Sequence, residues 1–171
     1  MQIRDRIIDF RRMKASSLAP CPRNWRTHPK AQQDALRGVL AEIGYADALL
    51  VRELPDGTLE LVDGHLRAET TPDQEVPVLV LDLDQAEAKK LMAVLDPLGA
   101  MAEANEKALG QLLAEIQTDS EAIQAMLDGL AEENGIAGDE VQAPESFGEM
   151  DENIETEHTC PKCGYQWSGG Q

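Results

Sequence analysis

Four residues with chemical or conformational potential follow one apolar stretch, in the segment LVDGHLRAE at residues 61–69. Gly64 permits a sharp turn and a close approach of the backbone to a ligand. His65 and Arg67 supply hydrogen-bond donors, and arginine can hold a phosphate through two parallel bonds. Asp63 can hold a metal ion, orient a donor or cap the helix that begins here. The spacing therefore predicts either a phosphate site or an ordinary turn that opens a helix.

A second polar segment lies upstream, in PCPRNWRTHP at residues 20–29. Its three prolines exclude regular secondary structure and predict a braced loop. Asn24, Arg26 and His28 stand at every second position of this loop. Such a set suits contacts with a phosphate or a nucleotide. The alternative is a rigid surface connector in which Trp25 plugs the core.

A third group of candidate ligands closes the chain, in HTCPKCGYQW. Cys160 and Cys163 have the Cys-x-x-Cys-Gly spacing of a zinc knuckle, but zinc takes four ligands. His158 is a candidate third ligand and Cys21 a remote fourth. Two chains could instead each give one cysteine pair. The remaining alternative is a metal-free tail whose two aromatic side chains dock a partner.

The apolar patterns predict the elements that position these residues. A helix is expected over residues 30–43, with Gly44 as its stop signal. ALLVRELPDGTLELVDG, residues 48–64, reads as two strands joined at Pro-Asp-Gly. VPVLVLDL, residues 76–83, has the near-continuous apolar run of a strand that is buried on both faces. Two short strand-like stretches precede them in residues 3–18.

Helices are expected after the last of these strands. Asp84 is a candidate N-cap with Glu87 at the capping-box position, and this helix should end at Pro97. Two further helices are expected at about 105–117 and 120–130, either as monomer core or as a homodimer interface. We therefore expect an α/β (α+β) fold, in which a small mixed sheet has flanking helices.

Charge is distributed unevenly along the 171 residues. The formal net charge is −17, yet residues 1–30 carry eight basic and two acidic side chains. Between Lys107 and Lys162 there are fourteen acidic residues and no basic one. This pattern predicts an anion-binding end and a solvating or partner-binding acidic end. It argues against broad wrapping of duplex DNA, which depends on many Lys/Arg–phosphate contacts.

Hydropathy and composition limit the compartment and the domain plan. No apolar run approaches the ~20 residues of a membrane span, and the N-terminus has no signal-peptide pattern. Three cysteines, two of them in CPKC, favour metal chemistry in a reducing cytoplasm. The expected domains are 1–120 for the α/β domain, 120–130 for a helix, 131–157 for a disordered acidic linker and 158–171 for the knuckle-like tail.

The order of these landmarks resembles the ParB N-terminal domain, whose fold is shared with sulfiredoxin. LAPCPRNWRTHPKAQQDALRGVLAEIGYADALLV, LELVDGHLRAE and EVPVLVLDL follow one another as in that family, and the resemblance covers about residues 12–117. It implies a nucleotide at Gly64-His65-Leu66-Arg67 and the neighbouring loop, with CTP, or ATP or ADP, and magnesium as expected ligands. Too little patterned sequence follows residue 130 for a helix-turn-helix domain, and His65 stands where a sulfiredoxin needs cysteine.

Three functions follow as hypotheses. The first is a ParB-like nucleotide- or DNA-associated module of a phage or mobile element, which reaches DNA through a modifying or packaging partner. The second is a small magnesium-dependent phosphotransferase or nuclease that uses the same pocket, with Glu42 and Asp47 as the nearest candidates for a base. The third is a non-catalytic acidic adaptor.

Overall fold

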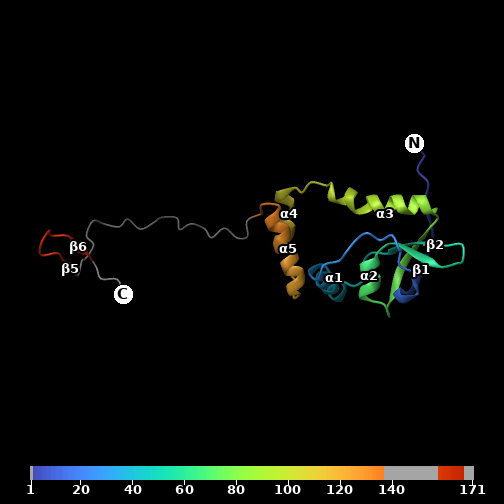
Figure 1. Ribbon diagram of the computed structural model, residues 1–171, viewed down its shortest axis with the longest axis horizontal. Helices are drawn as coiled ribbons and strands as arrows, with labels where there is room; N and C mark the ends of the chain where they lie inside the picture. The colour runs from blue at the N-terminus through green and yellow to red at the C-terminus, as the bar shows by residue number, and fades with distance from the viewer. Residues whose placement is uncertain (1, 137–157, 168–171) are drawn as a thin grey trace. The chain divides into compact units, whose positions relative to one another are not determined.

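A four-stranded sheet in the order β1-β4-β2-β3 is the centre of the first part of the chain. Its strands are β1 (Ile7–Lys14), β2 (Leu49–Glu53), β3 (Leu59–Asp63) and β4 (Glu75–Leu81). β4 runs antiparallel to β1 and parallel to β2, and β2 runs antiparallel to β3. The sheet is therefore mixed, as predicted, and helices flank it (Figure 1).

The computed structural model describes residues 2–136 and 158–167. The chain divides into two units, Met1–Ala137 and Gly138–Gln171. Most of the expected acidic linker lies outside the described residues. In the parts that are described, no helix has both the length and the apolar character needed to cross a membrane.

Turn chemistry and burial explain the strands. Gly57 adopts φ 83°, and Thr58 N–H donates to Asp56 Oδ1 at 3.0 Å, so the Pro-Asp-Gly turn closes the β2–β3 hairpin as predicted. β4 lies between β1 and β2, and Val76, Val78 and Val80 are fully buried. Each such side chain contributes about 1.5–3 kcal/mol by leaving water. β1 is a single strand of eight residues at the sheet edge, where two short stretches were expected.

The helices cover both faces of the sheet. They are the short 3-10 turn η1 (Ala15–Ser17), then α1 (Lys30–Glu42), α2 (His65–Thr70), α3 (Gln85–Ala100), α4 (Glu106–Glu115) and α5 (Glu121–Glu133). Ala68 of α2 and Ala15 of η1 join the buried cluster that contains Leu49 and Val51. On the opposite face, Ala88 and Met92 of α3 lie beside Val62.

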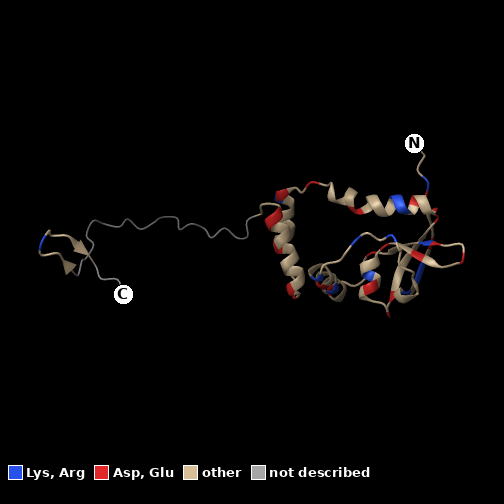
Figure 2. Ribbon diagram, viewed as in Figure 1, with Lys and Arg blue, Asp and Glu red and all other residues tan. Residues whose placement is uncertain are grey.

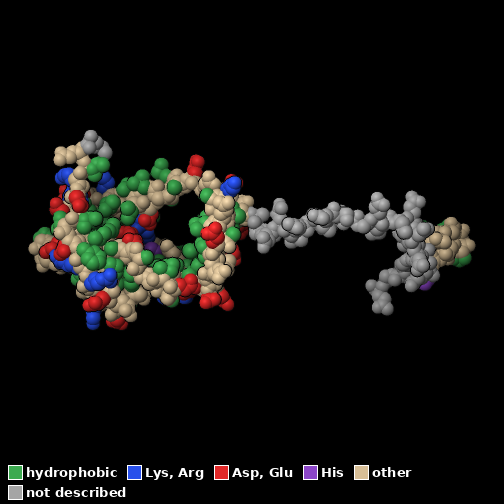
Figure 3. Space-filling view, turned by 180° about the vertical axis from the view of Figure 1, so that it is seen from behind, with side chains coloured by type: hydrophobic (Ala, Val, Ile, Leu, Met, Phe, Trp, Pro, Cys, Tyr) green, Lys and Arg blue, Asp and Glu red, His purple; other side chains and the backbone are tan. Residues whose placement is uncertain are grey.

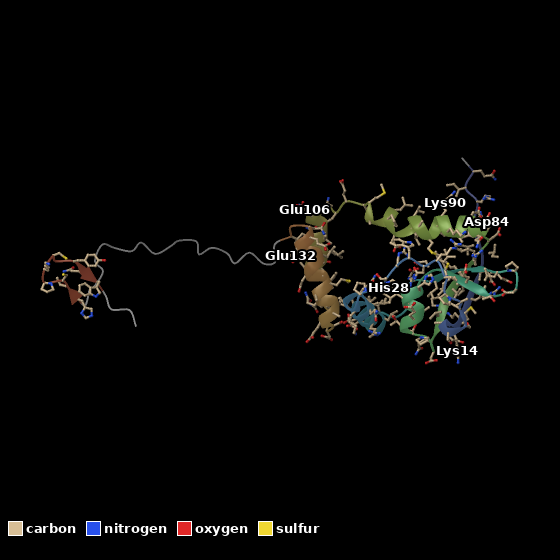
Figure 4. The ribbon with its side chains drawn as sticks, in the orientation of Figure 1. Lys14, His28, Asp84, Lys90, Glu106 and Glu132 are labelled. Atoms are coloured by element: carbon tan, nitrogen blue, oxygen red, sulfur yellow. The ribbon has the colours of Figure 1, made fainter. Side chains whose placement is uncertain are left out.

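α3 begins as predicted and ends later than predicted. Asp84 accepts a bond from Glu87 N–H at 2.8 Å, and Glu87 Oε2 accepts one from Asp84 N–H at 3.1 Å, which completes the capping box. Figure 4 marks Asp84 and Lys90 along this first half of the helix. The expected stop at Pro97 is wrong, because the helix tolerates the proline and continues to Ala100. A proline removes one backbone donor without preventing a final turn.

α5 packs against α1 and so belongs to the core of the first unit. A Cβ at Gly38 would lie 2.5 Å from Ser120 Oγ and 2.9 Å from Ile123 Cγ1, so the absence of a side chain lets the helices approach. Ile123 is buried, whereas acidic side chains occupy several exposed positions of α4 and α5 (Figure 2). α5 extends to Glu133, three residues into the expected linker.

Candidate functional site

The DGHLR segment (residues 63–67) and the proline loop (residues 20–29) meet at one cavity. It has a volume of about 340 Å³. The structure brings all seven residues of the predicted phosphate site to its wall: Asn24, Arg26, His28, Asp63, Gly64, His65 and Arg67. Ala35, Leu36 and Val39 of α1, Leu66 of α2 and Met126 of α5 add an apolar side. His28 lies beside α1 in Figure 4.

Backbone pairing places the proline loop beside β3. Ala19 N–H donates to Leu59 O and Ala19 O accepts from Leu61 N–H, both at 2.8 Å. This isolated bridge holds the chain against the strand just before the prolines begin. Cys21 N–H then donates to Nε2 of His65 at 3.1 Å. The loop is thus anchored to both the strand and the helix of the DGHLR segment.

His65 is a buried link between the two segments. Its side chain is 5% exposed, and Nε2 accepts a hydrogen bond, so the neutral ring carries its proton on Nδ1. Burial lowers the pKa of His65 from 6.5, and the nearby Asp63 and Glu69 charges only partly oppose this effect. His65 therefore remains uncharged at neutral pH and organises the cavity through its Cys21 bond.

Position 64 requires glycine for two reasons, its backbone conformation and the close approach of neighbouring side chains. It precedes α2 with φ 91°, a conformation that side chains with L chirality rarely adopt. A Cβ there would lie 2.7 Å from Leu49 Cγ and 3.3 Å from Arg67 Nη2. The glycine therefore lets α2 start directly against β2. α2 has only six residues, so its dipole is short and the arginines supply most of the positive charge.

Asp63 lies between the two arginines of the cavity. Arg67 Nη2 donates to Asp63 Oδ2 at 2.9 Å, and Arg26 Nη1 is 3.8 Å from Asp63 Oδ1. Arg67 Nη1 also pairs with Asp47, whose pKa is lowered first of all by that bond. The Asp63 carboxylate therefore faces cations on both oxygens.

One guanidinium nitrogen of Arg26 lacks an aligned hydrogen-bond acceptor among the residues that the structure describes. Its Nη2 lies 2.7 Å from Asp96 Oδ2, but the N–H directions miss that oxygen. The nitrogen is buried and makes no aligned hydrogen bond within the described residues. The guanidinium also lies 5.1 Å from the centre of the Trp25 ring. Trp25 itself is 61% exposed, so the alternative in which it plugs the core is wrong.

Asn24 and His28 shape the loop from within. Asn24 Oδ1 accepts from Arg26 N–H at 3.2 Å, which closes a local turn. His28 Nδ1 lies 3.0 Å from Gln32 Oε1, one turn into α1. Both residues line the cavity, and their contact with a ligand stays a prediction.

Sequence reasoning missed several residues at this site. Gln32 follows His28 by four positions, a helical spacing that could have suggested the pair. Asp96 reaches Arg26 from α3, and Met126 reaches the cavity from α5. Asp47 was expected near the pocket as a candidate base, and in the structure it pairs with Arg67. Only the course of α3 and the packing of α5 on α1 bring Asp96 and Met126 close, so no local signal identifies these two residues.

The cysteine-containing tail forms a hairpin of its own. β5 (His158–Thr159) pairs antiparallel with β6 (Gln166–Trp167), and the His158 ring lies 5.6 Å from the Trp167 ring. Within residues 2–136 and 158–167, no three His, Cys, Asp or Glu side chains gather as a metal site. A zinc site with Cys160, Cys163 and His158 therefore stays a prediction.

The fold places the chain in a structural class, because it has a fold like that of the ParB N-terminal domain. The crystal structure of the C-terminally truncated chromosome-partitioning protein ParB from Caulobacter crescentus, complexed with CTP-γ-S, superimposes with a TM-score of 0.54 at 20% identity. The match covers 75% of this chain and 72% of that one.

A Pnob8-like ParB-N domain is also similar, with a TM-score of 0.43 and 15% identity. That match covers 78% of this chain and about half, 52%, of the other. No family model matches the sequence, and no curated protein matches it. The similarity to the Caulobacter ParB structure confirms the predicted ParB-like fold.

Proposed function

We propose that the first unit is a ParB-like nucleotide-binding module that holds the phosphates of a cytidine nucleotide in the cavity. The observation that carries the proposal is the meeting of Arg26 and Arg67 in one wall beside the Gly64 turn. The similar Caulobacter ParB structure is complexed with CTP-γ-S, which supports CTP as the first ligand to test.

The chemistry of the cavity suits a nucleotide. Guanidinium groups bind phosphates through charge-assisted hydrogen bonds, and Gly64 leaves room for a close backbone approach. The apolar residues of α1, α2 and α5 suit a nucleoside, since ligand cavities combine an apolar wall with a few polar groups. A volume of about 340 Å³ lies in the usual range for such sites.

A phosphate can displace the carboxylates that pair with the two arginines. The side chains of Asp47 and Asp96 are 73% and 56% exposed. Water can therefore solvate these carboxylates once a phosphate takes their place beside the arginines. Asp63 is less exposed and remains beside both arginines, where it limits how closely an anion can approach.

The enzyme hypothesis receives less support. A general base works best with a pKa near the working pH, whereas Arg67 lowers the pKa of Asp47. Glu42 accepts a bond from Thr118 at 2.7 Å, and it is not among the residues of the cavity wall. Asp63 faces two guanidinium groups, which compete with magnesium for its oxygens. We therefore propose binding without a catalytic step.

Association with DNA would proceed through a partner protein. The net charge of −17 opposes extensive contact with phosphate backbones. The scattered acidic side chains of α4 and α5 suit a partner with basic side chains.

Calorimetric titration with CTP, ATP and ADP in the presence of magnesium tests the proposal. We expect saturable binding of CTP that weakens about tenfold or more in Arg67→Ala, because one charge-assisted contact contributes roughly 1.5–3 kcal/mol. Arg37→Ala is the matched control, since Arg37 lies on α1 and pairs with Asp34 away from the cavity wall. Circular dichroism checks that each variant folds. No nucleotide binding by the wild type, or equal binding by a folded Arg67→Ala, overturns the proposal.

A further inference from the structure

The C-terminal hairpin has the local geometry of half a zinc site. Cys160 N–H donates to Tyr165 O at 2.7 Å, and Gly164 N–H donates to Cys160 O at 2.9 Å. Gly164 adopts φ 75°, which permits this tight closure. The six-residue loop therefore turns both cysteines of CPKC to one end of the β5–β6 hairpin.

The sulfur of Cys160 is held by the loop backbone, because the N–H groups of Lys162 and Cys163 are directed at it. Amide groups in this arrangement are compatible with a sulfur that also binds a metal. Both cysteines are free, and Cys163 is exposed.

The hairpin alone is too small to account for its own stability. Each of its strands has two residues, and an isolated two-stranded hairpin is at best marginally stable in water. Two ring contacts contribute, those of Trp167 with His158 and with Tyr165. Metal binding is a common additional source of folding free energy in units of this size.

The CPKC loop has fewer ligands than a structural zinc ion needs, so the site requires ligands from elsewhere. A structural zinc ion takes four ligands, and the CPKC loop gives two. The third cysteine of the chain, Cys21, belongs to the first unit, where its N–H is bonded to His65 and it lines a small cavity with Val62. His158 does not form a three-residue ligand group with the cysteines of the described tail.

We propose that the C-terminal hairpins of two copies of this chain bind one zinc ion through the paired Cys160 and Cys163 of each copy. Each of the four thiols loses its proton to solvent as it binds, so the tetrathiolate zinc centre has a net charge of −2. Lys162 lies between the two cysteines, and two copies of it balance that charge. The outcome is a homodimer held at its C-terminal ends, independent of any nucleotide in the first unit.

Metal content and molecular mass of the full chain, purified in reductant with zinc present, test this proposal. We expect about half a zinc ion per chain, because four thiolates from two chains complete one tetrahedral site. Light scattering should give about twice the 18.7 kDa chain mass, and a chelator should return the monomer. Cobalt substitution should give the intense charge-transfer absorption of a tetrathiolate site.

Variants separate the proposed ligands from the alternatives. Cys163→Ser should lose both zinc and dimer, whereas Cys21→Ser and His158→Ala should retain both. One zinc ion per monomer overturns the proposal, as does a protein without zinc. A dimer that survives chelation or Cys163→Ser overturns it as well. Nucleotide binding by Cys163→Ser should match the wild type, so this result and the test of the cavity remain distinguishable.

Discussion

The backbone N–H of Cys21 donates a hydrogen bond to Nε2 of the buried His65, 3.1 Å away. This bond joins the proline loop to the DGHLR segment, the two segments that bring Arg26 and Arg67 to one cavity. The imidazole can accept it only while Nε2 is unprotonated. The integrity of the cavity is therefore linked to the charge state of His65.

The first prediction concerns the dependence of stability on pH. The folded pKa of His65 lies below 6.5, so the unfolded chain binds more protons between these two values. The free energy of unfolding should therefore decrease as the pH falls from 6.5 toward the lower folded pKa. His65→Gln should reduce this slope, as measured by urea unfolding at a series of pH values. His158→Gln, at an exposed position outside the first unit, is the control, and equal slopes for wild type and His65→Gln would contradict the assignment.

The second prediction separates the two requirements at Gly64. Gly64→Ala combines a left-handed backbone with a contact of 2.7 Å to Leu49, and it should destabilise the domain by about 2–4 kcal/mol. Gly57→Ala has a similar φ of 83° but no atom within 4 Å of the new Cβ, so it should cost only about 1–2 kcal/mol. Urea unfolding measures both. Equal losses would show that the contact with Leu49 is easily relieved.

The third prediction concerns the acid side of the stability profile. The Arg6 side chain, followed by the Asp84 N–H, lowers the pKa of Glu87 from 4.5 to about 2. The stabilisation by ionised Glu87 is present above pH 4.5 and is lost as the pH falls toward about 2. Glu87→Gln should flatten this part of the profile in thermal unfolding at low salt. Glu103→Gln, in the exposed connection after α3, should leave it unchanged.

The fourth prediction concerns the Arg52–Glu60 pair across β2 and β3. Arg52 Nη2 lies 2.7 Å from Glu60 Oε1, and the side chains are only 12% and 13% exposed. Glu60→Ala should cost about 3–5 kcal/mol, because it leaves a guanidinium largely buried and unpaired. Arg52→Met combined with Glu60→Leu should recover most of that loss. Additive losses in the double variant would contradict this account.

The parts of the fold that could be predicted depend on local chemistry. The Asp84–Glu87 capping box and the Pro-Asp-Gly turn are encoded within a few residues, and the structure contains both. The apolar run of β4 likewise predicts its burial. The end of α3 was misjudged because Pro97 costs one hydrogen bond, a loss that a long helix absorbs.

The candidate site was likewise predictable only where local sequence encodes it. Side chains from two separated segments were predicted to share a site because each has polar residues at a loop, and all seven line one cavity. The Cys21–His65 bond and the ion pairs with Asp47 and Asp96 depend on tertiary packing, so residue types alone could not reveal them. His65 was expected to contact a ligand, yet its located partner is the protein backbone.

A hollow lies between α3 and the α4–α5 pair (Figure 3). Many hydrophobic side chains line its rim, so part of the apolar surface of this domain is exposed. The same holds at the sheet edge, where Ile7, Ile8 and Phe10 of β1 are all exposed. An open edge strand invites pairing with other chains and hence aggregation. A register shift between Ile7 and Asp9 interrupts β1, and basic side chains crowd its second half. Both features disfavour the pairing of this edge with a strand of another chain, because the irregular backbone breaks the hydrogen-bond register and like charges repel.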